Sequence, residues 1–147
     1  MRLFAVALTY YQGTGPRPWE RVVAHLELAD EFPNECVGLV NRDPAQASEK
    51  LYKAAEETVK ALAAALRLNE TRTALEQDMW TAALLFNAVD SISNKLSNED
   101  VRLWWRAAWF LHVEGFRETR LNAEQVRRDL KYVEALMKLA REHVQVI

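Results

Sequence analysis

Cysteine is almost absent from this chain of 147 residues, since Cys36 is the only one. A single thiol excludes an intrachain disulfide and leaves too few ligands for a cysteine-based zinc site. Glycine and proline are scarce too, at four residues each, which argues against disorder and against a turn-rich β fold. We therefore expect one globular domain that folds without disulfide bonds or structural metal ions, and the cytoplasm is its simplest location.

A strong net charge and a long hydrophobic run are also missing. The formal net charge is −2, so there is no global attraction to nucleic acid or to anionic membranes, although a local basic patch is compatible with it. The apolar stretch at residues 3–11 is too short to span a bilayer, and its flanks do not resemble those of a signal peptide. We expect no membrane association. Residues 1–17 are predicted to form a packed N-terminal arm, as a short helix or an extended strand.

Helical signals begin directly after this arm. A first helix is predicted over residues 18–40, with a kink or a restart at Pro33 because proline removes a backbone donor. Asp43 followed by Pro44 is typical of a helix start, and the second helix should run from there to about Leu68. Small residues at helical spacing along it favour close packing against neighbours.

The second half of the chain predicts three more helices. Residues 69–78 are polar and are expected to form a connection, followed by helices over about 80–96 and 98–116. The last helix should start at Asn122, because Gln125 three residues later completes a capping-box pattern. The predicted fold class is all-α: a five-helix, up-and-down bundle over residues 18–147 with a short N-terminal arm.

The fourth predicted helix carries three tryptophans within six residues. From Leu103 to Val113 it is apolar on nearly every side except at Arg106 and His112. Such a helix is either central in its fold or covered by a second subunit, and one bundle has limited room for so much aromatic area. We therefore expect a homodimer. The residues assigned to the core or the dimer contact are Trp104, Trp105, Trp109 and Gly115.

The histidines are the first candidates for chemistry, because no Gly-rich phosphate loop, metalloprotease histidine pair or nucleophile elbow is present and no metal or cofactor is implied. His25 and His143 are expected at the surface. His112 falls on an apolar stripe, where its ring nitrogens need partners. It is therefore either a core histidine held by a carbonyl or carboxylate of another helix, or a general acid–base.

Arg106 could supply a fixed positive charge to such a site. Six positions apart on a straight helix, Arg106 and His112 point about 120° apart, since each residue advances about 100°. They converge only if the helix is distorted, if the arginine bends back, or if a two-fold axis brings one residue to the partner's copy.

A set of arginines follows on the same helix and on the next one. With adjacent aromatic residues they could form a phosphate-facing groove for single-stranded RNA. Interleaved acidic residues leave a solvated charged face as the alternative. The candidates for RNA binding are Arg102, Arg117, Arg120, Arg127 and Arg128.

Two stretches resemble the archaeal PaREP family: residues 43–62, beginning Asp-Pro-Ala-Gln-Ala-Ser-Glu-Lys, and residues 104–116, Trp-Trp-Arg-Ala-Ala-Trp-Phe-Leu-His-Val-Glu-Gly-Phe. The resemblance covers about residues 22–141. That family is grouped with the HEPN superfamily of five-helix bundles, which are often dimeric. Several lineages of the superfamily are RNA-cleaving toxins or act beside minimal nucleotidyltransferases. The resemblance implies an archaeal source, and the paired Glu and Lys residues of the surface are typical of a thermophile.

Ribonucleases of this superfamily carry an arginine, four to six further residues, and a histidine. Arg106 and His112, with five residues between them, fit this pattern. The resemblance implies a metal-independent site at a dimer interface, where the histidine assists attack by a ribose 2′-hydroxyl and the arginine stabilises the phosphorane. The position after the arginine is usually polar, and here it is Ala107.

Two functions are therefore expected. The first is an RNA-directed HEPN-like protein, either a toxin-like, metal-independent endoribonuclease or an inactive RNA or nucleotide binder. The alternative is a non-enzymatic homodimeric interaction module, with a minimal nucleotidyltransferase or an antitoxin as its partner.

Overall fold

The computed structural model describes residues 10, 11, 15, 16 and 18–144. Near the N-terminus, β1 (Tyr10–Tyr11) and β2 (Gly15–Pro16) form a short antiparallel pair. The described part of the predicted arm is therefore extended, and the rest of the arm lies outside the described residues. The helices that follow are α2 (Pro18–Leu39), α3 (Pro44–Ala65), α4 (Asn69–Gln77), α5 (Ala82–Leu96), α6 (Asp100–Phe110), the π-helix η1 (Leu111–Arg117) and α7 (Ala123–His143).

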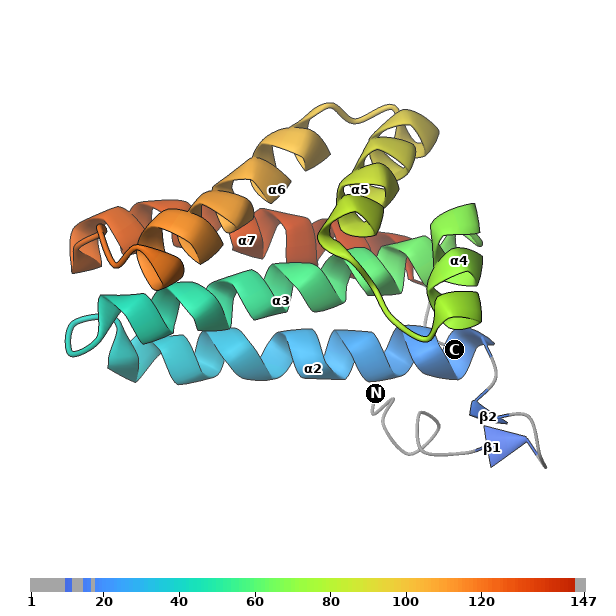
Figure 1. Ribbon diagram of the computed structural model, residues 1–147, viewed down its shortest axis with the longest axis horizontal. Helices are drawn as coiled ribbons and strands as arrows, with labels where there is room; N and C mark the ends of the chain where they lie inside the picture. The colour runs from blue at the N-terminus through green and yellow to red at the C-terminus, as the bar shows by residue number, and fades with distance from the viewer. Residues whose placement is uncertain (1–9, 12–14, 17, 145–147) are drawn as a thin grey trace.

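Three long helices run along the length of the molecule (Figure 1). α2 and α3 lie antiparallel, and α7 begins at the same end as α3. α5 stands across this layer and α6 slopes back over it, so the arrangement departs from a simple up-and-down bundle. η1 continues α6 and packs against α3. No helix in the described part of the chain is long and apolar enough to cross a membrane.

The all-α prediction is confirmed, but the predicted number of helices is wrong. The described residues form six α-helices instead of five, because the presumed connection at residues 69–78 contains α4. This helix buries only Ala74, so it has no apolar stripe to detect, and it ends at Asp78 in the left-handed conformation (φ 57°). A hydrogen bond from Ser91 to Glu70 (3.1 Å) ties it to α5.

The predicted helix starts agree with the structure. The Asp43 side chain accepts a hydrogen bond from the Gln46 amide (3.1 Å), and Pro44 occupies the first turn of α3. Asn122 and Gln125 form both bonds of the capping box at the start of α7. At Pro33 the chain does not restart, because α2 continues through it to Leu39.

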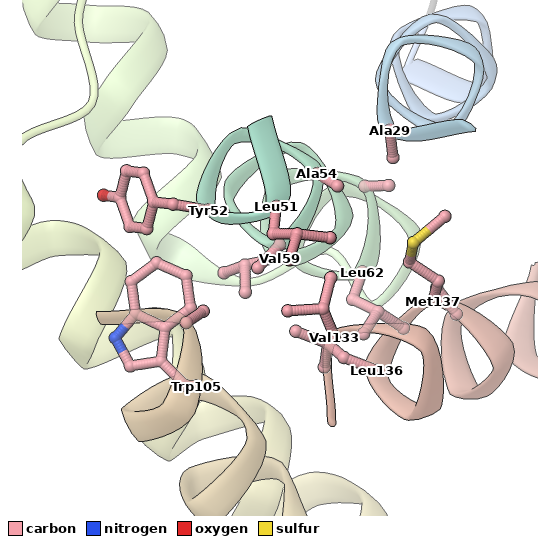
Figure 2. Close-up of a cluster of buried hydrophobic side chains, with 14 of the residues drawn as sticks. Ala29, Leu51, Tyr52, Ala54, Val59, Leu62, Trp105, Val133, Leu136 and Met137 are labelled. Carbon is pink, nitrogen blue, oxygen red and sulfur yellow. The ribbon is translucent and has the colours of Figure 1, made fainter. Parts of the chain in front are cut away.

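The central helix of the fold is α3, which packs against every other described helix. Its small residues are buried on almost all sides, and Leu51, Val59 and Leu62 are fully covered. Figure 2 shows them between side chains of α7, such as Leu136, and of α2, such as Ala29. Short alanine side chains let the neighbouring helices approach α3 closely. The most buried helix is thus the alanine-rich one.

The tryptophan-rich helix is correspondingly more peripheral than its composition predicts. Trp105 is 1% exposed, and Trp104 and Trp109 pack against the core while staying partly accessible. On the opposite side of α6, Leu103 is 55% and Phe110 is 46% exposed. Of the two alternatives for this helix, a central position and a cover by a second subunit, the exposed Leu103 and Phe110 do not favour the central one. Its outer face is open, which leaves the predicted second subunit as a proposal.

Candidate functional site

His112 lies in the π-helix η1 and bonds to a carboxylate of α3. Its Nδ1 is 2.8 Å from Oε1 of Glu49, 63 positions earlier in the chain. Both side chains are about four-fifths buried, at 20% and 18% exposure. A π-helix is a rare conformation that occurs frequently at functional sites. The predicted partner for His112, a carboxylate from another helix, is thus confirmed.

Aromatic rings enclose the imidazole of His112. Tyr52 stacks on it with the ring centres 4.2 Å apart and 23° between the planes. Phe116 lies nearly parallel to it at 6.4 Å, and Trp109 is tilted against it at 5.2 Å. Phe86 of α5 meets Trp109 edge-on at 5.0 Å. We call Tyr52, Phe86, Trp109, His112 and Phe116 the aromatic cluster.

The Tyr52 side chain is buried in this cluster, at 5% exposure. Burial, and then the negative charges of Glu56 and Glu49, raise the pKa of Tyr52 well above its ordinary value. Tyr52 therefore stays a neutral phenol over the whole physiological range. It can stack and donate a hydrogen bond, but it cannot act as a base.

The two ring nitrogens of His112 have different roles. Because an ionised carboxylate only accepts hydrogen bonds, Glu49 requires the proton of a neutral imidazole to sit on Nδ1. The lone pair of Nε2 is then free. In the described part of the chain Nε2 bonds to no other group, and it is not among the completely buried polar atoms that lack a partner. This arrangement suits a general base.

Arg106 does not join His112 within the chain. It is exposed on α6, and among the described residues it makes no hydrogen bond or ion pair. It lies on the outer face of the helix between Leu103 and Phe110. The switch to a π-helix at Leu111 changes the register, but it turns His112 toward α3 instead of toward Arg106.

The five RNA-binding candidates separate into two groups. Arg102 is held by α5 and the start of α6, through Asp90 (2.9 Å), Ser93 (2.6 Å) and Glu99. Its guanidinium joins two helices and has little capacity left for a phosphate. The other four lie where η1 ends and α7 begins: Arg117, Arg120, Arg127 and Arg128.

Acidic residues accompany this second group. Arg120 pairs with Glu114 (2.6 Å), and Arg128 pairs with Glu124 (3.1 Å). Arg127 donates to Asn41 (2.7 Å) at the turn between α2 and α3, and Arg117 is exposed at the end of η1. The structure therefore gathers four of the candidates at one end of the bundle and neutralises part of their charge.

The structure contains a second histidine–glutamate pair that was not predicted from the sequence. His25 of α2, expected at the surface, is only 27% exposed, and its Nδ1 lies 2.6 Å from Oε1 of Glu57 on α3. Lys60 bonds to both Glu57 (3.2 Å) and Glu56 (3.0 Å). No local pattern signals the pair, because its members lie 32 positions apart.

Neighbouring charged groups set the direction of the pKa shifts of Glu57 and Lys60. Burial alone would raise the pKa of Glu57, but the hydrogen bonds and charges of His25 and Lys60 outweigh it and hold the pKa below its ordinary value. The same carboxylates outweigh burial at Lys60 and raise its pKa. No group of three or more potential metal ligands occurs among the described residues.

These features define a class: an α-helical bundle whose central helix presents a glutamate to a histidine on a π-helical turn. Residues 24–137 match the archaeal PaREP1/PaREP8 family, and the chain belongs to that family. It is similar to a crystal structure of a structural-genomics target from Sulfolobus solfataricus, with 32% identity and a TM-score of 0.72 over 80% of this chain and 96% of the other.

A solution structure of the same target is also similar. It has 32% identity and a TM-score of 0.62, and the match covers 84% of this chain and 90% of the other. No curated protein matches the chain.

Proposed function

We propose that this protein is a HEPN-like, metal-independent endoribonuclease with His112 as its general acid–base. The observation that carries the proposal is the pairing of His112 Nδ1 with Glu49 at 2.8 Å, which leaves Nε2 without a bond among the described residues. Glu49 fixes the tautomer and stabilises the imidazolium that forms when Nε2 takes a proton. The aromatic cluster around the ring offers stacking surfaces for unpaired bases.

The reaction follows from these groups. Nε2 of His112 removes the proton of a ribose 2′-hydroxyl, whose oxygen attacks the adjacent phosphorus. The bond to the 5′-oxygen then breaks, and the imidazolium returns a proton to that oxygen. The products are a 2′,3′-cyclic phosphate and a 5′-hydroxyl, so the step needs neither water nor a metal. An arginine beside the phosphate stabilises the added charge of the phosphorane.

Arg106 is the arginine that we assign to this role. Because it does not reach His112 within one chain, the complete site requires either a bent arginine or a second copy packed on the outer face of α6. The exposed Leu103 and Phe110 on either side of Arg106 favour the second arrangement. Arg117 and Arg127, at the nearby end of the bundle, would contact the flanking RNA backbone.

The test is cleavage of a mixed RNA substrate in the presence of EDTA. We expect wild-type protein to produce cyclic-phosphate ends, and His112→Ala to lose at least about 10²-fold in rate. His25→Ala is the matched control, because it also removes a histidine from a glutamate of α3, and it should cleave normally. Absence of cleavage by the wild type, or equal rates for wild type and His112→Ala, would contradict the proposal.

A second candidate function rests on the same face of α6. Leu103 and Phe110 are about half exposed on a single helix face, which is typical of a contact surface. A homodimeric interaction module, serving a nucleotidyltransferase or an antitoxin, would use that face without catalysis. Light scattering of wild type and Leu103→Asp tests this contact surface, which the ribonuclease would also use, and the cleavage assay separates the two functions. A dimer that Leu103→Asp converts to a folded monomer supports the interface, and a monomeric wild type excludes it.

A further inference from the structure

Gly115 is a point of close contact between η1 and α3. It is buried three residues after His112, and a Cβ added to it would lie 2.2 Å from Oγ and 2.6 Å from Cβ of Ser48. The methyl group of Leu121 closes the other side at 3.3 Å. No side chain larger than hydrogen fits here without a shift of one of the helices.

Ser48 cannot easily yield this space. Its hydroxyl donates to the carbonyl oxygen of Pro44 at 2.8 Å, which fixes the side chain against its own helix. That first turn of α3 is in turn held by the cap that Asp43 provides. The surface on which Gly115 rests is therefore rigid.

The contact lies next to the proposed catalytic pair. Ser48 and Glu49 are neighbours on α3, and Gly115 and His112 lie on the same π-helical turn. Moving a Cβ from 2.2 Å to an ordinary contact of at least 3.4 Å requires a shift of 1.2 Å (3.4 − 2.2). If the 2.8 Å distance between His112 and Glu49 increases by this amount, the two side chains are too far apart for a hydrogen bond.

We infer that Gly115 is the positioning residue of His112: its contact with Ser48 sets the depth at which η1 packs on α3, and thereby the bond from His112 to Glu49. The catalytic consequence rests on the proposed function, whereas the geometric one does not. Gly115→Ala should release the Nδ1–H tautomer of His112. It should also lower the rate of RNA cleavage by about 10²-fold, the cost of a misplacement of about 1 Å.

The experiment is a size-compensation series with ¹⁵N NMR of the imidazole nitrogens, recorded at a pH where the imidazole is neutral. Wild type should show His112 protonated on Nδ1 and bare on Nε2, and Gly115→Ala should show a mixture of tautomers. Ser48→Gly removes both atoms that clash and should restore the wild-type signals in the double variant with Gly115→Ala. Ser48→Ala removes only the hydroxyl, leaves the 2.6 Å contact with Cβ, and should fail to rescue.

Gly38→Ala is the matched glycine control, because no atom lies within 4 Å of a Cβ at that position of α2. It should leave the tautomer and the cleavage rate unchanged. An unchanged His112 tautomer in Gly115→Ala would overturn the inference. A double variant that keeps mixed tautomers, or that does not fold, would also overturn the inference. The same holds if Gly115→Ala alone does not fold, because the double variant should then restore the fold. Because the tautomer is observed without RNA, an inactive wild type would remove the proposed function and leave this inference decided by the NMR series.

Discussion

The protein contains two histidine–glutamate pairs, and both glutamates come from α3. His112 bonds to Glu49 and His25 bonds to Glu57, at 2.8 and 2.6 Å through the same ring nitrogen. Their surroundings differ. His112 lies on a π-helical turn between aromatic rings, whereas His25 lies on a regular helix beside a lysine that bonds to its partner Glu57. In the described part of the chain, no aromatic ring contacts His25.

This contrast shows that the hydrogen bond alone does not identify a functional site. The lysine beside Glu57 already balances the carboxylate, so the His25 pair resembles a structural link between α2 and α3. Glu49 forms no ion pair except with His112 among the described residues, so its charge is available to an imidazolium. The stacking rings add a platform for bases at one pair and not at the other.

The largest expected effect is on RNA cleavage, when the charge of Glu49 is removed and the same change at Glu57 serves as the comparison. Glu49→Gln should lower the rate of RNA cleavage by about 10²–10⁴-fold, because an amide neither stabilises the imidazolium nor fixes the tautomer. Glu57→Gln should cleave at the wild-type rate. Rates are measured under single-turnover conditions at a temperature where both variants are folded.

Thermal unfolding of both variants controls for loss of structure. Equal loss of activity in the two variants would show that the pairs are not functionally distinct. Full activity of Glu49→Gln would assign the His112 pair a structural role, like the one that we give to His25.

Much of the fold follows from local sequence signals. The cap at Asp43 and Pro44 and the box at Asn122 and Gln125 act within four residues, so both helix starts were predictable. The peripheral position of α6 was not, because burial depends on which helices cover it. Large aromatic residues suggested a central helix, yet the small residues of α3 permit the closest packing and occupy the centre.

The candidate site was only partly predictable. The sequence indicates that His112 needs a partner, but not that Glu49 supplies it from 63 positions away. The π-helical turn at Leu111–Arg117 was also not predicted from the sequence. Long-range packing therefore determines which residue becomes the partner of His112, and the local sequence pattern does not.

A smaller effect is expected on stability at the His25 pair. Because the pKa of Glu57 is lowered in the folded state, its contribution is present above the ordinary carboxyl pKa and is lost as pH falls through the folded value. Glu57→Gln should reduce the free energy of unfolding by about 1.5–3 kcal/mol at pH 7, the range for hydrogen bonds to charged groups. The difference should shrink as pH falls from about 4.5 through the lower pKa of folded Glu57, because below that value both chains carry a neutral group.

Urea unfolding of wild type and Glu57→Gln between pH 3 and pH 7 measures this difference. Lys60→Met is a useful companion, because it removes the lysine that balances Glu57 and keeps the helix propensity. A pH-independent difference between wild type and Glu57→Gln would mean that lost packing, and not the ionised carboxylate, explains the change.

The smallest effect is expected at Tyr52 and appears only in alkali. Its pKa is raised by burial and by Glu56 and Glu49, so above about pH 10 the unfolded chain ionises this phenol while the folded chain does not. Folding then takes up a proton, and stability must fall as pH rises, by at most about 1.4 kcal/mol per pH unit for one group.

Tyr52→Phe keeps the ring stacked on His112 and removes the ionisation. The variant should match wild type within about 1 kcal/mol at pH 7 and gain on it between pH 10 and 11 in urea unfolding. Tyr132→Phe is the matched control, because that ring is 38% exposed on α7. Parallel pH profiles for wild type and Tyr52→Phe would show that this phenol ionises equally in the folded and the unfolded chain, which would contradict the prediction.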